Sequence, residues 1–264
     1  MIRSAEYHRQ RGDASRARPP WVRSGTGRKK TLDEFGADGI LALHEMPYAA
    51  FHPDCHAITK PTLADLRKLA GEIASSGLML MNYDLDSLEP LAVFRDLEIL
   101  KIMTSGRITT LHGLASHSKL RYLVIAPPPS WDGSSRRIEV DSYRPIASLR
   151  SLERLSLLRV RPRDLDLAPI AAMRHLRDLH IAGVPEFTLE HYARLAAALP
   201  ETEGHCLQPF VKIEGIGFCK PCGGRMVLLT GAPPRARNWL CPKCNEKKLA
   251  AHVARWEEIK KAAQ

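Results

Sequence analysis

Between Leu88 and Ile102 the chain reads LEPLAVFRDLEILKI, and this stretch decides the fold. Leucine or phenylalanine stands at every third residue up to Leu100, and Ile102 follows two residues later. A spacing of three suits a 3₁₀ or helical turn, whereas a spacing of two is that of a strand whose alternate residues point inward. The stretch therefore predicts a helical turn that leads into a short strand, with Leu100 and Ile102 inward.

The same pattern recurs three more times, in residues 111–125, 146–157 and 167–181. His117 interrupts the apolar spacing of the second unit. The equivalent leucines are Leu100, Leu123, Leu155 and Leu179, at steps of 23, 32 and 24 residues. A unit of this size cannot bury its apolar face alone, so the units are expected to stack on one another.

The recurring L-x-x-L-x-L motif resembles the leucine-rich-repeat family over about residues 78–200. The resemblance implies an α/β fold, a solenoid of short parallel strands joined by helical or 3₁₀ turns. Leu78 and Leu80 are expected to supply an earlier strand. The family usually has Asn or Cys three residues after the last strand leucine, and the turns here are expected to be irregular because other residues stand there. These residues are Ser105, Pro128, Val160 and Val184.

Four cysteines form two C-x-x-C pairs, eighteen residues apart: Cys219 and Cys222, then Cys241 and Cys244. Two residues between thiols let both sulfurs of a tight turn reach one ion at about 2.3 Å, and two such turns complete a tetrahedron. With expected strands at 225–231 and 238–240, the segment resembles a zinc ribbon. Four cysteine ligands leave no open position, so structural Zn²⁺ is the expected cofactor. Iron, a pair of disulfides or a redox C-x-x-C remain alternatives.

These patterns divide the chain into four segments. They are a disordered basic tail at 1–30, an N-terminal capping region at 31–77, a leucine-rich-repeat domain at 78–210 and a zinc ribbon with a C-terminal helix at 211–264. Helices are expected from Thr62, over 188–199 with Thr188 as N-cap, and over 245–262. The last helix carries Leu249, Val253, Trp256 and Ile259 on one face, which is expected to pack on its own domain. A helix that binds a partner through this face is the alternative.

The net charge of +10 is concentrated at the two ends of the chain. Residues 1–30 and 212–264 each carry +7, whereas residues 31–211 carry −4. Basic ends attract nucleic acid or acidic proteins. The alternative is a solvated tail and lysines that offset the charge of a tetrathiolate site. Those lysines are Lys220, Lys243, Lys247 and Lys248.

Residues that alternate with the inward leucines point to the opposite, concave face of the expected sheet. They form a strip of apolar, aromatic and charged side chains, the mixture that protein interfaces use at their centres. The strip consists of Met79, Met81, Ile99, Lys101, Met103, Tyr122, Val124, Arg154, Ser156, Leu158, Asp178 and His180. We expect it to bind a protein partner, unless residues 31–76 or the ribbon cover it.

The sequence therefore favours a non-enzymatic interaction scaffold, because no HExxH, GxSxG or complete phosphate loop is present. An enzyme that uses the loop His52 to His56 has the least support. The main alternative is nucleic-acid binding through the basic tail and the ribbon, with Trp239 stacking on a base. No apolar stretch reaches membrane-spanning length and no secretory signal is evident, so a cytoplasmic location and no membrane partner are expected.

Overall fold

The computed structural model describes residues 55–72, 76–104, 107–128, 137–212, 218–232 and 238–264. The chain divides into two units, residues 1–31 and 32–264. The first unit lies outside the described residues, and so does the basic tail predicted at 1–30. The predicted loop at 127–135 is described only at its first two residues.

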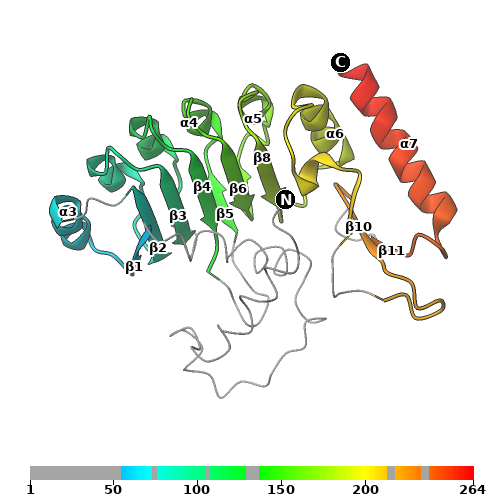
Figure 1. Ribbon diagram of the computed structural model, residues 1–264, viewed down its shortest axis with the longest axis horizontal. Coiled ribbons are helices and arrows are strands. Elements are labelled where there is room, and N and C mark those ends of the chain that lie inside the picture. Colours follow the sequence, from blue (N-terminus) through cyan, green and yellow to red (C-terminus); the bar gives the residue numbers. More distant parts are fainter. Residues whose placement is uncertain (1–54, 73–75, 105–106, 129–136, 213–217, 233–237) are drawn as a thin grey trace. The chain divides into compact units, whose positions relative to one another are not determined.

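A six-stranded parallel sheet forms the centre of the second unit (Figure 1). Its strands, in spatial order, are β1 (Cys55–Thr59), β2 (Gly77–Tyr83), β3 (Ile99–Thr104), β4 (Tyr122–Ala126), β6 (Arg154–Leu158) and β8 (Asp178–Ala182). The α/β class and the strand at Leu78 and Leu80 are confirmed. Strand β1 was not predicted, and it lies within the segment assigned to the N-terminal cap.

The register of the sheet places the repeated leucines side by side. Each strand from β2 onwards aligns its leucine with that of the next strand, in the series Leu78, Leu100, Leu123, Leu155 and Leu179. All five side chains are 2% exposed or less. The inward orientation predicted from the alternating spacing is confirmed, and the steps of 23, 32 and 24 residues each lead to a neighbouring strand.

A row of short helices leads into the strands and lies on one side of the sheet (Figure 1). The row runs α3 (Leu63–Glu72), η3 (Glu89–Val93), η4 (His112–Ser116), α4 (Arg144–Ala147), α5 (Ala168–Ala171) and α6 (Leu189–Ala198), each in contact with the next. The η helices are 3₁₀ helices, as the three-residue spacing predicts. Leu91 and Leu114 turn into the core from η3 and η4.

The two longest helices of this row begin at polar capping residues. Before α3, the backbone N–H of Asp65 donates to Thr62 Oγ1 at 3.2 Å, and the N–H of Thr62 donates to Asp65 Oδ2 at 2.9 Å. Before α6, the backbone N–H of Thr188 donates to His191 Nδ1 at 3.1 Å. Reciprocal bonds of this kind satisfy amide groups that have no partner inside a helix, and both predicted helix starts are confirmed.

A second, two-stranded parallel sheet pairs β5 (Ile138–Val140) with β7 (Val160–Pro162). It accounts for part of the long step between Leu123 and Leu155, and the sequence did not predict it. Ile138, Val140 and Val160 are fully buried. An irregular turn was expected at Val160, but this residue lies in β7 and is fully buried.

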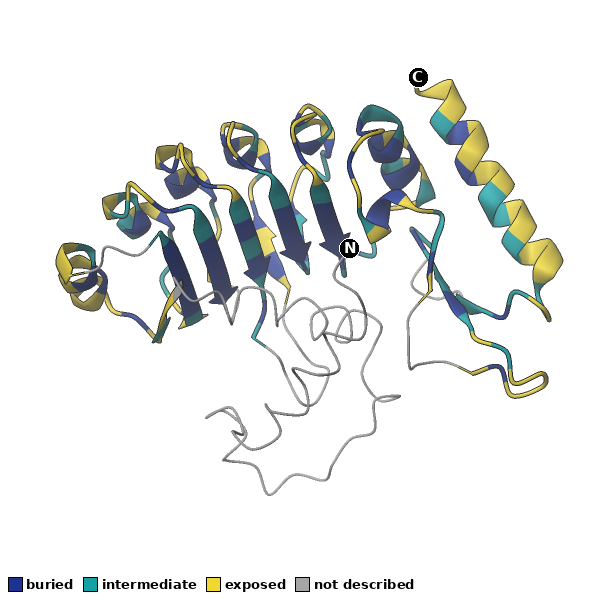
Figure 2. Cartoon of the chain, in the orientation of Figure 1, coloured by how far each residue is buried: buried dark blue, intermediate teal, exposed yellow. Residues whose placement is uncertain are grey.

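The C-terminal part of the chain contains a small antiparallel sheet and one helix. The sheet, in the order β11-β10-β9, consists of β9 (Phe210–Lys212), β10 (Val227–Leu229) and β11 (Trp239–Leu240), and the helix is α7 (Glu246–Ala262). The strands expected at 225–231 and 238–240 are confirmed, and β9 is an addition. Figure 2 shows α7 mostly exposed, with its buried residues on one side.

Helix α7 packs on α6, and Trp256 and Ile259 are 1% and 7% exposed. Both side chains belong to the same apolar cluster as the leucines of the large sheet. This face therefore packs on α6, within the segment predicted at 78–210, which corrects the expectation that it packs on its own domain at 211–264. None of the described helices is both long and apolar enough to cross a membrane.

Candidate metal centre

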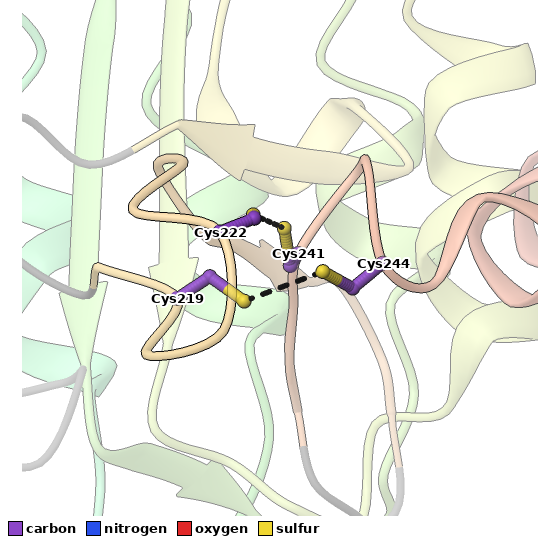
Figure 3. Close-up of side chains that lie close together, drawn as sticks. All are labelled: Cys219, Cys222, Cys241 and Cys244. Carbon is purple, nitrogen blue, oxygen red and sulfur yellow. Dashed lines mark hydrogen bonds between the residues drawn. The ribbon is translucent and has the colours of Figure 1, made fainter.

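The four predicted cysteines come together in one cluster. The Sγ atoms of Cys219, Cys222, Cys241 and Cys244 all lie within 4.8 Å of one another. Figure 3 shows the two pairs facing each other, with 3.4 Å between Cys222 and Cys241 and 3.7 Å between Cys219 and Cys244. Four sulfurs at about 2.3 Å from one tetrahedral zinc would stand about 3.8 Å apart. The cluster could therefore hold a metal ion such as zinc.

The first cysteine pair sits on a tight turn between β9 and β10. The N–H of Cys219 donates to the carbonyl of Gly224 at 2.8 Å, and the N–H of Gly223 donates to the carbonyl of Cys219 at 2.7 Å. Gly223 has φ +67°, a conformation that side-chain-bearing residues rarely adopt. A Cβ on Gly224 would stand 3.3 Å from Cys222 Sγ, so this turn brings the backbone close to the sulfurs.

The second pair joins β11 directly to α7. Cys241 follows the last residue of β11, and α7 begins two residues after Cys244. The N–H of Asn245 donates to the carbonyl of Cys241 at 2.8 Å, and Asn245 Oδ1 accepts the N–H of Cys241 at 3.4 Å. Two ligand positions are therefore continuous with the first turn of the helix.

The pKa values of three of the thiols are shifted because their surroundings differ. The backbone N–H of Cys244 lowers the pKa of Cys241 to about 7. Burial raises the pKa of Cys219, and hydrogen bonding with Cys222 raises that of Cys244. A metal binds thiolates, so loading the site releases protons and affinity falls with decreasing pH. Of Cys219, Cys241 and Cys244, the thiol of Cys241 ionises most readily.

Exposed basic residues lie close to the four cysteines in the sequence. Arg225 is exposed, and so are four lysines close to the cysteines in sequence, Lys220, Lys243, Lys247 and Lys248. Four thiolates around a divalent cation carry a net charge of −2, which nearby lysines offset. The predicted role of these lysines in charge balance is therefore compatible with their positions.

No family model matches the chain, and no curated protein matches it. Among the described residues, the four cysteines are the one group of metal-ligating side chains that converge on a point. Of the loop considered for catalysis, His52 and Asp54 lie outside the described residues, while Cys55 and His56 are consecutive in β1.

Four residues of the predicted binding strip form an aligned row at the start of the strands. Ile99, Tyr122, Arg154 and Asp178 are register partners on β3, β4, β6 and β8. All four are half-buried, and the Arg154 guanidinium carbon lies 4.9 Å from the centre of the Tyr122 ring. We call these four residues the strand-start row. Met81 and Val124 are also half-buried.

The other residues of the predicted strip are not exposed, which corrects the expectation that the whole strip is open. Leu158 packs with Val211, and Leu228 and Trp239 of the small sheet join the same cluster. The His180 ring lies against His205, 5.9 Å between ring centres. Alternation predicts which face a side chain points to, but it does not predict what covers that face. The buried members are Met79, Lys101, Met103, Ser156, Leu158 and His180.

Trp239, which was expected to stack on a base, packs instead beside Leu158 and Ala182. Phe218 is the exposed aromatic residue among the described residues of the module, at 62%, and it directly precedes Cys219. Sequence reasoning missed it, although its place beside Cys219 was a usable signal.

Sequence reasoning also missed a ladder of ion pairs beside the strand-start row. Arg121 lies 3.6 Å from Glu98 and 2.8 Å from Glu153, and Arg177 lies 3.7 Å from Glu153. Each of these residues directly precedes a member of the strand-start row. The alternation of acid and base at equivalent places of the repeats was visible in the sequence.

Proposed function

We propose that this chain is a leucine-rich-repeat scaffold whose C-terminal end is stabilised by a structural zinc ribbon. The alignment of Leu78, Leu100, Leu123, Leu155 and Leu179 on consecutive parallel strands supports the first part, since a stack of repeats requires equivalent residues to be neighbours. The convergence of four sulfurs within 4.8 Å supports the second.

The scaffold binds a protein partner through the strand-start row, and it is not an enzyme. The row combines an aliphatic residue, an aromatic residue and both signs of charge on one aligned line across β3, β4, β6 and β8. Tyrosine and arginine are the residue types that most often dominate binding energy at interfaces. The stacking of Arg154 on Tyr122 holds both side chains in place before a partner arrives.

Paired variants of the full chain test this function by quantitative affinity purification from cells. Tyr122→Asp introduces a charge into the row, whereas Val93→Asp introduces the same charge on the helical side, where Val93 is 49% exposed. We expect at least one protein to be retained by the unaltered chain and by Val93→Asp, and to be lost with Tyr122→Asp. Nuclease treatment should leave that protein bound. Equal recovery with all three chains would contradict the proposal.

A second candidate function, binding of single-stranded nucleic acid, is favoured by one observation at the cysteine module. Phe218 is 62% exposed, and Lys220 and Arg225 beside it are exposed as well. An aromatic ring flanked by basic groups can stack on a base while the cations contact phosphates.

Fluorescence anisotropy with a labelled single-stranded oligonucleotide tests this second candidate. Binding should be present at low salt, weaken steeply as salt rises, and fall with Phe218→Ala. Leu63→Ala serves as the control, since Leu63 is an exposed apolar residue (47%) at the other end of the described chain. Absence of a complex at low salt would show that the chain does not bind single-stranded nucleic acid in this way.

A further inference from the structure

The C-terminal part of the chain, β9 to β11 and α7, contacts the end of the large sheet on two separate surfaces. We call this part the C-terminal cap. On the first surface, α7 packs on α6 and places Trp256 and Ile259 in the main apolar cluster. These are the only two buried residues of the seventeen in α7.

On the second surface, the small antiparallel sheet covers the ends of β6 and β8. Leu158 and Ala182 pack there with Val211, and Leu228 and Trp239 lie against the same cluster. The strands of the small sheet have three, three and two residues. Strands this short do not form a stable sheet without further support.

Specific contacts tie α7 both to the small sheet and to α6. His252 Nε2 of α7 lies 2.8 Å from the carbonyl oxygen of Pro209, which directly precedes β9, and Arg255 of α7 lies 3.5 Å from Glu190 of α6. Gly231, after β10, approaches the start of α6 so closely that a Cβ would stand 2.4 Å from the nitrogen of Leu189. The C-terminal cap therefore fits closely against α6, which leaves little room for the small sheet and α7 to change their angle to each other.

The cysteine cluster stands at the junction of the two surfaces. Cys241 ends the small sheet, Cys244 precedes α7, and the turn with Cys219 and Cys222 meets them from the other side (Figure 3). One ion bound to all four sulfurs would fix the direction in which α7 leaves the sheet. Few apolar residues of each part are buried, so a metal ion that joins the two parts would stabilise both contacts.

We propose that metal occupancy of the cysteine cluster determines whether α7 stays docked on α6, so that the ribbon is a metal-dependent cap of the large sheet. This inference rests on the proposed zinc binding but not on the identity of any partner. Loss of the ion releases α7 and uncovers the apolar end of the sheet around α6, while β2, β3 and β4 keep their packing. Removal of the metal would thereby open one end of the large sheet.

Hydrogen exchange of the full chain, zinc-loaded and after chelation under reducing conditions, tests the direct effect. We expect amide hydrogens of α6 and α7 to exchange at least about tenfold faster without metal, because local opening governs exchange. Peptides from β2 to β4 should exchange at unchanged rates. Equal rates in α6 and α7 with and without zinc would overturn the inference while leaving the zinc site intact. If the protein binds no zinc, the proposed site and this inference both fail.

Zinc affinity measured by chelator competition tests the reciprocal effect. If zinc favours docking, docking must favour zinc by the same factor, so Trp256→Ala should weaken zinc binding by roughly 5- to 150-fold. Glu257→Ala is the matched control, because Glu257 is the next residue and is exposed. Should Trp256→Ala fail to fold, Ile259→Ala removes a smaller part of the same contact. Unchanged zinc affinity in a folded docking variant would overturn the inference.

Discussion

In the large sheet, every strand from β2 to β8 contributes two leucine or isoleucine side chains that are 2% exposed or less. The small C-terminal sheet has strands of three, three and two residues, and four sulfurs converge beside it. One region is stabilised by apolar burial that accumulates along the row of strands. The other region is too small for that, and we propose that it is stabilised at one point by a metal ion.

The largest effect is expected from removing metal ligands. Changing Cys219 and Cys222 together to serine should abolish metal binding and unfold the small sheet, since zinc binding supplies about 10–16 kcal/mol to folding in small zinc domains. Metal content and exchange protection of β10 (Val227–Leu229) report this loss. Cys206→Ala is the control, because Cys206 is a buried cysteine outside the cluster and its loss should leave one metal per chain. Full exchange protection of β10 in the double serine variant would show that the small sheet does not need a metal ion to stay folded.

A large cavity in the main core should produce the second largest effect. Leu123 is fully buried at the centre of the large sheet, so Leu123→Ala should lower the free energy of unfolding by about 2–5 kcal/mol. Denaturant titration measures it, and Val93→Ala at a half-exposed site is the comparison. The variant should keep its bound metal. Loss of metal from Leu123→Ala would show that the two regions are not stabilised separately.

A close backbone contact between neighbouring helical turns should give a smaller effect. A Cβ on Gly113 would stand 2.2 Å from the carbonyl carbon of Leu88, so Gly113→Ala forces η4 away from η3. We expect a loss of about 1–3 kcal/mol in the free energy of unfolding. Gly71→Ala is the matched control, since no atom lies within 4 Å of its added Cβ. Equal stability of the two variants would mean that the turns are not tightly stacked.

His117, which interrupts the apolar spacing of the second unit, should make the free energy of unfolding depend on pH. His117 is fully buried, with Nδ1 3.1 Å from the carbonyl oxygen of Phe94, and burial lowers its pKa below the usual value. Above about pH 6.5 His117 is neutral whether the chain is folded or not, so protonation takes nothing from the free energy of unfolding. As pH falls below that value, the unfolded chain takes up a proton that the folded chain resists, and stability is lost.

The replacement His117→Leu restores the apolar spacing and should flatten this pH dependence. Denaturant titrations from pH 5 to 8 should show that the variant loses less stability in acid than the unaltered chain does. His112→Gln at an exposed position serves as the control. If stability falls with pH equally for His117→Leu and for the unaltered chain, His117 is not the source of the pH dependence.

The smallest effect is expected at exposed ion pairs of the large sheet. Lys119 lies 2.6 Å from Asp96, but the two side chains are 64% and 80% exposed. Solvent and salt screen such pairs, so Lys119→Ala should leave the free energy of unfolding unchanged within experimental error. Thermal unfolding at low and high salt measures it. A marked, salt-sensitive loss would show that charge pairs, and not leucine packing, dominate the sheet.

The sequence predicted the parts of the molecule that repeat or have a strict spacing. The alternating apolar residues Leu100 and Ile102 were enough to orient every equivalent strand, because side chains of a strand point to one of two faces. The spacing of the four cysteines was likewise enough to predict a cluster, since a C-x-x-C turn brings both thiols to one side. Thr188 and Thr62 were recognisable as helix starts for a similar local reason.

The rest depends on contacts between residues far apart in the chain, which local patterns do not encode. The burial of Leu158 requires Val211, more than fifty residues later, so spacing within β6 could not reveal it. Strands β5 and β7 form only because they pair with each other. The exposure of Phe218 and the burial of Trp239 depend on how the small sheet lies against Ala182.

A crystal structure of the zinc-loaded protein, with data collected at the zinc absorption edge, tests the contrast between the two regions most directly. The account predicts one anomalous peak per chain, at about 2.3 Å from all four cysteine sulfurs. It also predicts parallel strands that align Leu100 with Leu123, Leu155 and Leu179. No metal at the cysteines, or a sheet in which these leucines are not neighbours, would contradict it.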